Sequence, residues 1–275
     1  MSYAIESIAK SIGARRVGKH KATIDWLLTD SRSLSFPEET LFFALTTKRN
    51  SGARYIPDLY DRGVRNFVIT EEDFKEVENG ELRVESSMQH DGAQPTLNSQ
   101  LSTLNFLIVP NPLKALQKLA ETHRDKFKIP VIGITGSTGN TIVKEWLHQL
   151  LRQDRCIVRS PRSYNSQIGV PLSVWQLSEE AELGIFEAGI SEMGEMGALK
   201  RMIKPTIGIL TNIGGAHQEN FFSLQEKCME KMTLFKDCDV VIYNGDNELN
   251  SNCFVKSQFY ASENALTRTH IERML

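Results

Sequence analysis

A glycine-rich turn between residues 135 and 141 is the segment of this sequence best suited to chemistry. It follows the apolar run VIGI and precedes a helix-like stretch. Glycines let backbone N–H groups approach an anion, and a helix start adds a favourable dipole, so this order predicts a phosphate site. The Thr141 hydroxyl could also bind Mg²⁺. A simple strand-to-helix connection stays open, because GxxxxGK[ST] is not met: Ile134 stands at its first glycine and Asn140 at its lysine. The turn consists of Thr135, Gly136, Ser137, Thr138, Gly139, Asn140 and Thr141.

The elements around this turn predict a parallel sheet with helices on both faces. Apolar, β-rich runs recur from residue 131 onward, separated by helix-like stretches: VIGIT, LGIFEAG, TIGILTNI and DVVIYNGD. Continuous apolar strands that alternate with helices are typical of a buried parallel sheet, whose ligands bind at the carboxyl ends of the strands. The stretch from Asn250 contains one strand-like run and a helix-like tail. Because such sheets usually continue, we expect this second domain to be incomplete.

The first part of the chain predicts a small mixed α/β domain. TLFFAL and RNFVIT are typical of strands, YIPDLYDRG of a helix closed by Gly63, and PNPLKALQKLAETHRDKF of a longer helix. Residues 84–105 are rich in Ser, Gln, Asn and Thr, which cannot form a packed core, and we interpret them as a mobile insert. The expected domains are therefore 1–109 and 110–275.

Composition and charge exclude several classes of protein. The 32 Lys and Arg residues nearly balance 34 Asp and Glu residues, and the net charge of −2 gives no reason to expect nucleic acid or an anionic membrane as partner. No apolar run approaches the roughly 18 residues of a membrane span, and the start lacks a signal-peptide core. The four cysteines form no CxxC pair, which favours free thiols in a reducing compartment. We expect a cytoplasmic protein.

Six segments in series resemble motifs of the Mur ligases, ATP-dependent enzymes of bacterial cell-wall synthesis. VIGITGSTGNTIVKEWL resembles the family's ATP loop, TGxxGKT after a buried strand, and TDSRSLSFPEETLFFAL resembles DSR…PGxLFxAL of its UDP-binding domain. Four others resemble its NNxxGxP stretch, acidic strand end, histidine segment and modified-lysine helix: SYNSQIGVPLSV, FEAGISEMGEM, TNIGGAHQENF and QEKCMEKMTLF. The likeness is greatest to ligases that add D-alanyl-D-alanine to UDP-N-acetylmuramoyl-tripeptide, in the form fused to an alanine racemase.

The resemblance implies a UDP-binding domain followed by a P-loop-type ATPase domain, with ATP and Mg²⁺ as cofactors. ATP would activate a carboxylate as an acyl phosphate, which an amine then displaces. Thr141 and Glu187 would bind the Mg²⁺ held by ATP, and His217 a second Mg²⁺. Lys231 matches the lysine that the family carbamylates, and with Glu187 and His217 it forms the expected catalytic set. A complete family member has a third domain, and we expect neither that domain nor a racemase within this chain.

The same resemblance implies where the substrate binds. Ser31 and Arg32 match the signature that contacts the UDP part, and a planar guanidinium suits a diphosphate because it binds two oxygens at once. Asn165 and Ser166 match positions that touch the sugar-peptide, although an ordinary polar turn is the alternative.

Each catalytic assignment has a simpler alternative. Glu187 could cap a nearby helix, and His217 could bond to backbone. Lys227 and Lys231 lie four apart on a charged helix, which by itself favours a solvated face. Residues 30–32 could form a turn with a local ion pair.

One departure from the family pattern concerns the charge at the phosphate loop. Asn140 replaces the family's lysine, and its amide carries no charge and reaches less far. Loss of one preorganised charge beside a developing anion costs about 3–4 kcal/mol. Lys144 lies one turn further along the helix, and we do not expect it to point the right way to replace that charge. We therefore expect poor use of ATP.

Three functions stay open on these grounds. The first is a ligase of the kind described, as an impaired variant or a fragment. The second is a non-catalytic module that holds UDP-sugar peptide or a protein partner beside an inactive ATP loop. The third is a related ligase such as a folylpolyglutamate synthase, against which the DSR…LFFAL segment argues.

Overall fold

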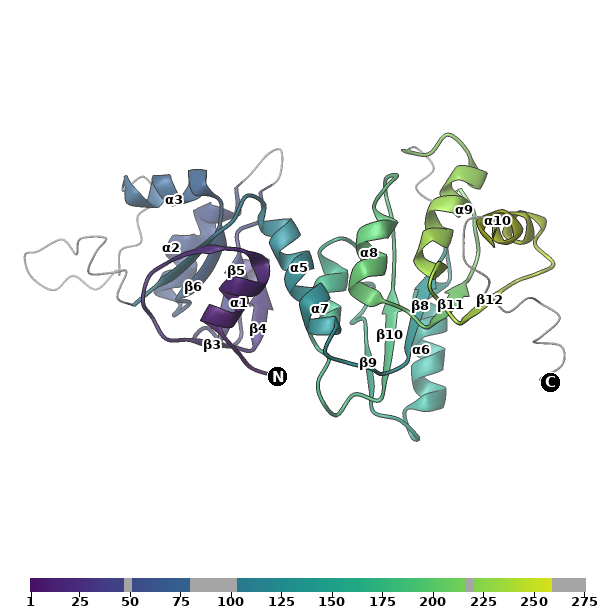
Figure 1. The fold of residues 1–275 in the computed structure, drawn as a ribbon, viewed down its shortest axis with the longest axis horizontal. Coiled ribbons are helices and arrows are strands. Elements are labelled where there is room, and N and C mark those ends of the chain that lie inside the picture. Colours follow the sequence, from purple (N-terminus) through teal and green to yellow (C-terminus); the bar gives the residue numbers. More distant parts are fainter. Residues whose placement is uncertain (47–50, 80–102, 216–219, 259–275) are drawn as a thin grey trace, which may run out of the picture. The chain divides into compact units, whose positions relative to one another are not determined.

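The described residues form two five-stranded β-sheets, one in each of two compact units, Met1–Leu119 and Ala120–Leu275, and a further two-stranded sheet in the first unit (Figure 1). The computed structural model describes residues 1–46, 51–79, 103–215 and 220–258. The division lies within α5 (Pro112–Arg124), whereas the sequence suggested a boundary between residues 109 and 110. The helix that we expected after that boundary is present, but it runs across the division between the units.

The first unit is a mixed α/β domain, as expected. Its sheet has the order β2-β7-β6-β5-β4, in which β2 is antiparallel to β7 and the remaining pairs are parallel. The runs TLFFAL and RNFVIT form strands, and Gly63 follows the predicted helix with a left-handed φ of 98°. Phe42, Phe67 and Phe106, one from each of three neighbouring strands, pack against one another in the core of this unit. The elements are β1 (Tyr3–Ala4), α1 (Ile5–Ile12), β2 (Arg15–Val17), β3 (Thr23–Ile24), β4 (Trp26–Leu28), η1 (Ser31–Ser33), β5 (Thr40–Phe43), η2 (Gly52–Tyr55), α2 (Ile56–Asp61), β6 (Asn66–Ile69), α3 (Glu71–Glu78) and β7 (Asn105–Ile108).

The predicted insert ends earlier than expected, because Asn105 is the first residue of β7. Its side chain is fully buried and donates to the Asn66 Oδ1 atom at 2.7 Å and to the His20 carbonyl at 2.8 Å. An asparagine with its amide paired in this way belongs to the core despite its polar type. The rest of the predicted insert, up to residue 102, lies outside the described residues.

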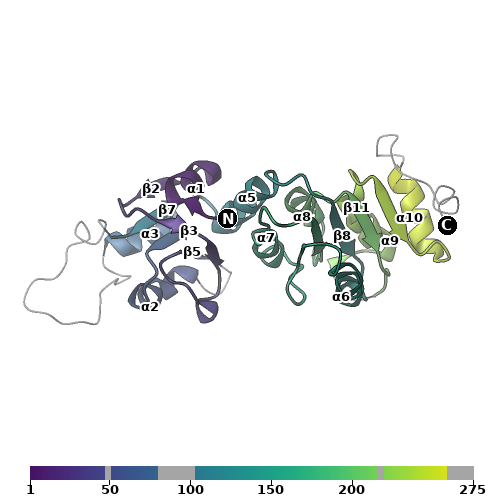
Figure 2. The ribbon, with the colours of Figure 1, turned by 90° about the horizontal axis from the view of Figure 1, so that it is seen from below.

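The second unit contains the predicted parallel sheet. Its strand order is β12-β11-β8-β10-β9, and every pair is parallel. Helix α6 packs on one face, while α7, α8 and α9 cover the other, and Figure 2 shows α6 and α8 on opposite sides of β8. The elements are β8 (Val131–Thr135), α6 (Asn140–Leu151), β9 (Ile157–Arg159), α7 (Gly169–Val174), β10 (Leu183–Glu187), α8 (Met196–Ile203), β11 (Ile207–Leu210), α9 (Leu224–Met232), η4 (Thr233–Phe235), β12 (Val240–Tyr243) and α10 (Glu248–Gln258).

The prediction of a strand after Asn250 is wrong, because these residues belong to α10. Cys253 and Phe254 are buried, and the Phe254 ring stacks on that of Tyr243 with centroids 4.6 Å apart. Burial of one helical face therefore outweighs the strand preference of the individual residues.

Two strand glycines let neighbouring segments pack closely on the sheet. A Cβ atom on Gly208 would lie 2.3 Å from the Phe235 ring, and one on Gly133 would lie 2.9 Å from Pro205. Such distances are below any real Cβ contact, so a glycine is required at each position. The contact of Phe235 with Gly208 fixes the end of α9, which carries Lys231.

Buried polar groups give this unit a pH dependence. Burial lowers the pKa of His123 to about 4, although its ring nitrogen bonds to the Leu177 carbonyl at 3.0 Å. The folded state thus favours neutral His123, so its contribution to stability is complete above pH 6.5 and is lost as pH falls towards 4.

We expect His123→Gln to flatten the decrease in stability between pH 6.5 and 4, where each pH unit costs wild type up to about 1.4 kcal/mol. Urea unfolding at a series of pH values measures the effect, with His20→Gln in the first unit as the control. An unchanged slope in His123→Gln would contradict the assignment.

Candidate functional site

The carboxyl end of β8 is the point where the order of the parallel sheet reverses. β8 pairs with β10 on one side and with β11 on the other, and the chain visits the β10 side before it crosses to β11. Ligands of open α/β sheets bind at such a switch point. The glycine-rich turn begins here, Glu187 ends β10, and Thr211 directly follows β11. The glycine-rich turn and Glu187, which the sequence singled out, therefore lie together at the carboxyl end of one sheet.

The turn is held by hydrogen bonds to both neighbouring strand ends. Thr135 Oγ1 donates to the Ala188 carbonyl at 2.6 Å, beyond β10, and the Ser137 amide donates to the Asn212 carbonyl at 2.6 Å, beyond β11. A Cβ on Gly136 would lie 2.0 Å from Thr211 Oγ1, so only glycine fits there. Gly139 has a φ of 86° and caps α6 without a side-chain hydrogen bond. The first N–H groups of α6 therefore lack a side-chain acceptor at the cap, which suits an anion.

Asn140 takes part in the internal bonding of the turn. Its Nδ2 atom donates to the Gly136 carbonyl at 3.1 Å, and its Oδ1 atom accepts from Thr211 Oγ1 at 2.7 Å. Thr211 Oγ1 also lies 2.7 Å from the Thr138 carbonyl. Both ends of the Asn140 amide are thus engaged within the protein, and the side chain supplies shape to the turn but no charge.

Thr141 and Glu187 are brought together as the sequence predicted. The Thr141 hydroxyl donates to Glu187 Oε2 at 3.2 Å, and the Glu187 side chain is 1% exposed. The Glu187 amide donates to Ser160 Oγ at 3.2 Å, which fixes the end of β10. Two oxygens this close match adjacent ligands of an octahedral ion, which at about 2.1 Å from the ion would lie about 3 Å apart. The pair therefore fits Mg²⁺.

Lys144 lies at this site, although the sequence analysis considered it only as a replacement for the missing charge of the turn. It is completely buried, and its Nζ atom lies 2.8 Å from Glu187 Oε1 and 3.3 Å from Glu145 Oε1. It also donates to the Arg162 carbonyl. The ammonium faces the carboxylate of β10 rather than the turn, so it does not replace the charge missing at Asn140. The i, i+3 spacing from Thr141 on α6 was the available signal.

Lys231 and Lys227 are buried, which overturns the solvated face that their spacing favoured. Lys231 is 2% exposed, and its Nζ atom donates to the Gly136 carbonyl at 3.0 Å and lies 3.4 Å from Thr135 Oγ1. Lys227 is 1% exposed and donates to the Gly214 carbonyl at 2.9 Å. Burial, together with the positive charge of Lys227, lowers the pKa of Lys231 to about 8. Lys231 thus borders the turn from α9, and Lys227 borders the segment after β11.

Asn165 contacts the segment after β10, whereas Ser166 contacts the start of α7. The Asn165 carbonyl accepts from the Gly189 amide at 2.8 Å, and a Cβ on Gly189 would lie 2.9 Å from the Asn165 side chain. Asn165 therefore lies directly beyond Glu187. The Ser166 hydroxyl accepts from the Gly169 amide at 3.1 Å, a local hydrogen bond in the turn that leads into α7.

Ser31 and Arg32 lie in the first unit, within η1. Arg32 pairs with Asp30 at 2.7 Å, its side chain is 87% exposed, and the Ser31 carbonyl accepts from Arg62 at 2.8 Å. The local ion pair weighed as the simpler alternative is therefore present. An exposed guanidinium with such a pair can exchange it for a diphosphate at small cost.

His217 lies outside the described residues. Among the residues that the structure does describe, no three His, Cys, Asp or Glu side chains converge on a common point. In the same part of the chain, no helix is both long and apolar enough to cross a bilayer. All four cysteines are free, and Cys156 alone among them is exposed.

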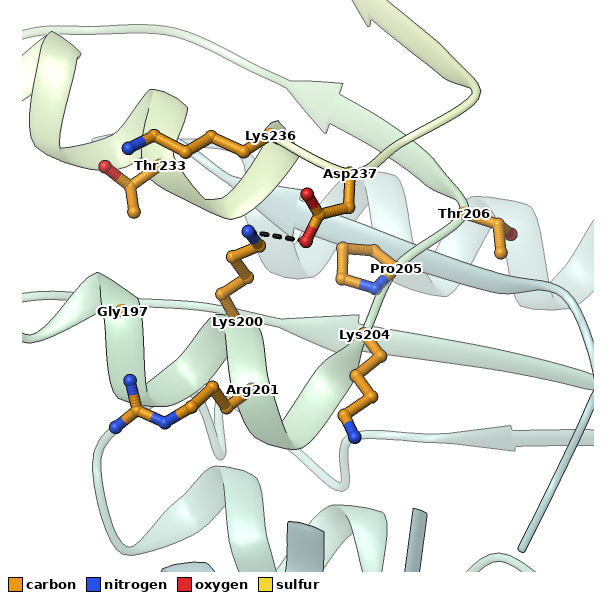
Figure 3. Close-up of a pocket in the computed structure, with 9 residues that line it drawn as sticks. All are labelled: Gly197, Lys200, Arg201, Lys204, Pro205, Thr206, Thr233, Lys236 and Asp237. Atoms are coloured by element: carbon orange, nitrogen blue, oxygen red, sulfur yellow. Dashed lines mark ion pairs between the residues drawn. The ribbon is translucent and has the colours of Figure 1, made fainter. Parts of the chain in front are cut away.

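A basic pocket of about 530 Å³ lies at the other edge of the sheet, before β11 (Figure 3). Lys200 pairs there with Asp237 at 2.5 Å, and Lys204 pairs with Asp125. Its cations lie at the C-terminal ends of α8 and of the α9–η4 segment, where positive side chains offset the helix dipoles. We therefore attribute its charge to helix termination and place the functional site at the glycine-rich turn.

Comparison with known proteins relates the chain to one family. The family described as Mur ligase middle domain matches residues 134–270. UDP-N-acetylmuramoyl-tripeptide–D-alanyl-D-alanine ligases of Borreliella burgdorferi and Rickettsia prowazekii are each 32% identical over 78% of this chain and 42% of their own length. The chain thus spans less than half the length of these curated relatives.

Solved structures show the same fold. A crystal structure of MurF from Acinetobacter baumannii matches with a TM-score of 0.76 and 19% identity, over 94% of this chain and 52% of that one. MurF from Thermotoga maritima in complex with ADP matches with a TM-score of 0.64 and 22% identity, over 87% of this chain and 49% of that one.

Proposed function

Because this chain carries a Mur ligase middle domain and belongs to the Mur ligase family, we propose that it serves in an ATP-dependent ligase of peptidoglycan precursor synthesis. The proposed reaction adds D-alanyl-D-alanine to UDP-N-acetylmuramoyl-tripeptide, the activity that the names of its curated relatives state. These names also favour this branch over a folylpolyglutamate synthase. The observation that carries the proposal is the convergence of the glycine-rich turn, Glu187 and Lys231 at one sheet edge.

The proposed roles follow from the contacts. The turn 135–141 would hold the phosphates of ATP through its backbone amides, in line with the ADP complex of the Thermotoga maritima protein. Thr141 and Glu187 would hold Mg²⁺, which when bound would neutralise charge on the transferring phosphoryl group. His217 is proposed as a ligand of a second Mg²⁺ on resemblance alone. The carboxylate of the tripeptide would be activated as an acyl phosphate.

Two sets of residues are proposed to bind parts of the substrate. Ser31 and Arg32 would bind its UDP part, and Asn165, with Ser166, its sugar-peptide part. A third ligase domain would bring the incoming amine, and the resemblance to the fused form implies an alanine racemase in the same protein. We propose that this protein acts in the cytoplasm.

Lys231 is the proposed carbamylated lysine, and its environment supports this. Carbamate formation needs a neutral amine, and a pKa of about 8 leaves a sizeable neutral fraction near pH 8. We expect ¹³C NMR in ¹³C-bicarbonate to give one carbamate carbonyl signal. Lys231→Arg should abolish the signal, whereas Lys227→Arg, one turn away, should retain it. A wild-type spectrum without the signal would contradict carbamylation.

Asn140 is the proposed cause of weak nucleotide use. We expect Asn140→Lys to tighten binding of a fluorescent ADP analogue at least about tenfold, because it restores a charge beside the phosphates. In a protein extended by the third domain of a relative, ligase activity should rise by a similar factor. Asn140→Gln adds length without charge and is the matched control. Equal affinity in both variants would show that charge at residue 140 is not the deficit.

A non-catalytic binding module is the second candidate, and the uncharged Asn140 favours it. Calorimetric titration with UDP-N-acetylmuramoyl-tripeptide and, separately, with Mg-ATP distinguishes the two. The ligase requires measurable binding of both, and Arg32→Gln should weaken only the first. Binding of the UDP-peptide without ATP would establish the module, and binding of neither would reject both candidates.

A further inference from the structure

The buried Lys144–Glu187 ion pair places a cation beside the proposed metal ligand. Lys144 Nζ lies 2.8 Å from Glu187 Oε1, and the two side chains are 0% and 1% exposed. Oε1 has no well-directed hydrogen bond in the described structure, so its contact with Lys144 is chiefly electrostatic. The other oxygen, Oε2, accepts from Thr141. The carboxylate thus presents one oxygen to an ammonium and one to the proposed metal position.

The position of the ammonium is fixed by its surroundings. Lys144 Nζ also donates to the Arg162 carbonyl and lies 3.3 Å from Glu145 Oε1. Arg162 has a φ of 50°, in the left-handed region that non-glycine residues seldom adopt, and in this conformation its carbonyl meets Lys144. Glu145 is in turn bonded to Arg159 at 3.0 Å. The lysine is therefore anchored from α6, from the turn after β9 and from β10.

The charge of this arrangement opposes a divalent ion that arrives alone. A buried carboxylate without a partner would attract a cation strongly, but Lys144 already neutralises Glu187. The other proposed protein ligand is the neutral Thr141 hydroxyl, and the described residues contain no group of three His, Cys, Asp or Glu side chains that could hold a metal ion by itself. Mg²⁺ in such sites depends on substrate phosphates for the rest of its ligands and charge.

We propose that Lys144 is the internal counter-ion of Glu187 and prevents a divalent ion from binding there until nucleotide phosphates accompany it. The inference rests on the proposed function for the identity of the metal position. Without nucleotide, the positive charge of Lys144 balances the negative charge of Glu187. With nucleotide, phosphate oxygens add the negative charge that the protein alone does not offer, so the metal enters with the nucleotide.

Titration with Mn²⁺, followed by electron paramagnetic resonance of the free ion, tests this without any turnover. Mn²⁺ replaces Mg²⁺ because both prefer carboxylate, hydroxyl and water oxygens. Nucleotide-free wild type should show no tight Mn²⁺ site at Glu187. Lys144→Met should bind Mn²⁺ at least about tenfold more tightly than wild type. A neighbouring cation weakens proton binding at a carboxylate by at least about this factor, and we expect a similar effect on a metal ion. Lys144→Met with Glu187→Gln should lose this gain.

Glu145→Gln is the matched control, because it removes the other carboxylate near Lys144 and leaves the proposed pair intact. It should not raise Mn²⁺ affinity. A gain in Lys144→Met that survives Glu187→Gln would overturn the proposal. A tight Mn²⁺ site in nucleotide-free wild type would also overturn it, if Thr141→Val removes that site. This comparison of wild type with Thr141→Val can be made even if Lys144→Met does not fold.

A second titration series with ADP present separates this inference from the proposed function. Wild type should bind Mn²⁺ together with ADP and not before it. Failure of ADP to bind at all would count against nucleotide use, whereas the Mn²⁺ affinities of the nucleotide-free variants would still decide the role of Lys144. Equal Mn²⁺ affinity of wild type with and without bound ADP would reject the counter-ion role alone.

Discussion

The pairing of β8 with β10 on one side and β11 on the other is the constraint on which the site depends. Parallel register brings the ends of three strands to one edge, and residues from distant parts of the sequence meet there. The hydrogen bonds of Thr135 to Ala188 and of Ser137 to Asn212 tie the turn to both neighbours. A displacement of either strand by one residue would reverse its inward and outward faces and dismantle the site.

The strands of the second unit and the glycine-rich turn of the site could be predicted, because each depends on a short stretch of sequence. Continuous apolar runs announced the strands, and the glycine-rich turn followed directly from VIGIT. The start of β7 could not be predicted, because Asn105 is a polar residue that becomes part of the core only through its contact with Asn66. The helix at Cys253 was missed for the same reason, since packing against other elements decided it.

The charges of the site were the least accessible to sequence reasoning. Spacing on a helix says that Lys227 and Lys231 share a face, but it does not say whether that face meets water or a loop. Burial changes the consequence completely, because a solvated lysine is inert whereas a desolvated one has a lowered pKa. Lys144 was judged only against the missing lysine of the turn, and its partner Glu187 lies 43 residues away in sequence.

The contact between Gly208 and Phe235 has a consequence for tolerance to mutation. The aromatic ring occupies the space that a side chain of β11 would otherwise fill, and Phe235 ends the segment that carries Lys227 and Lys231. A single added methyl group would have to be accommodated by a shift of that helix relative to the strand. A side chain at residue 208 would therefore displace the amines of a different element, and the disturbance would reach the glycine-rich turn through Lys231.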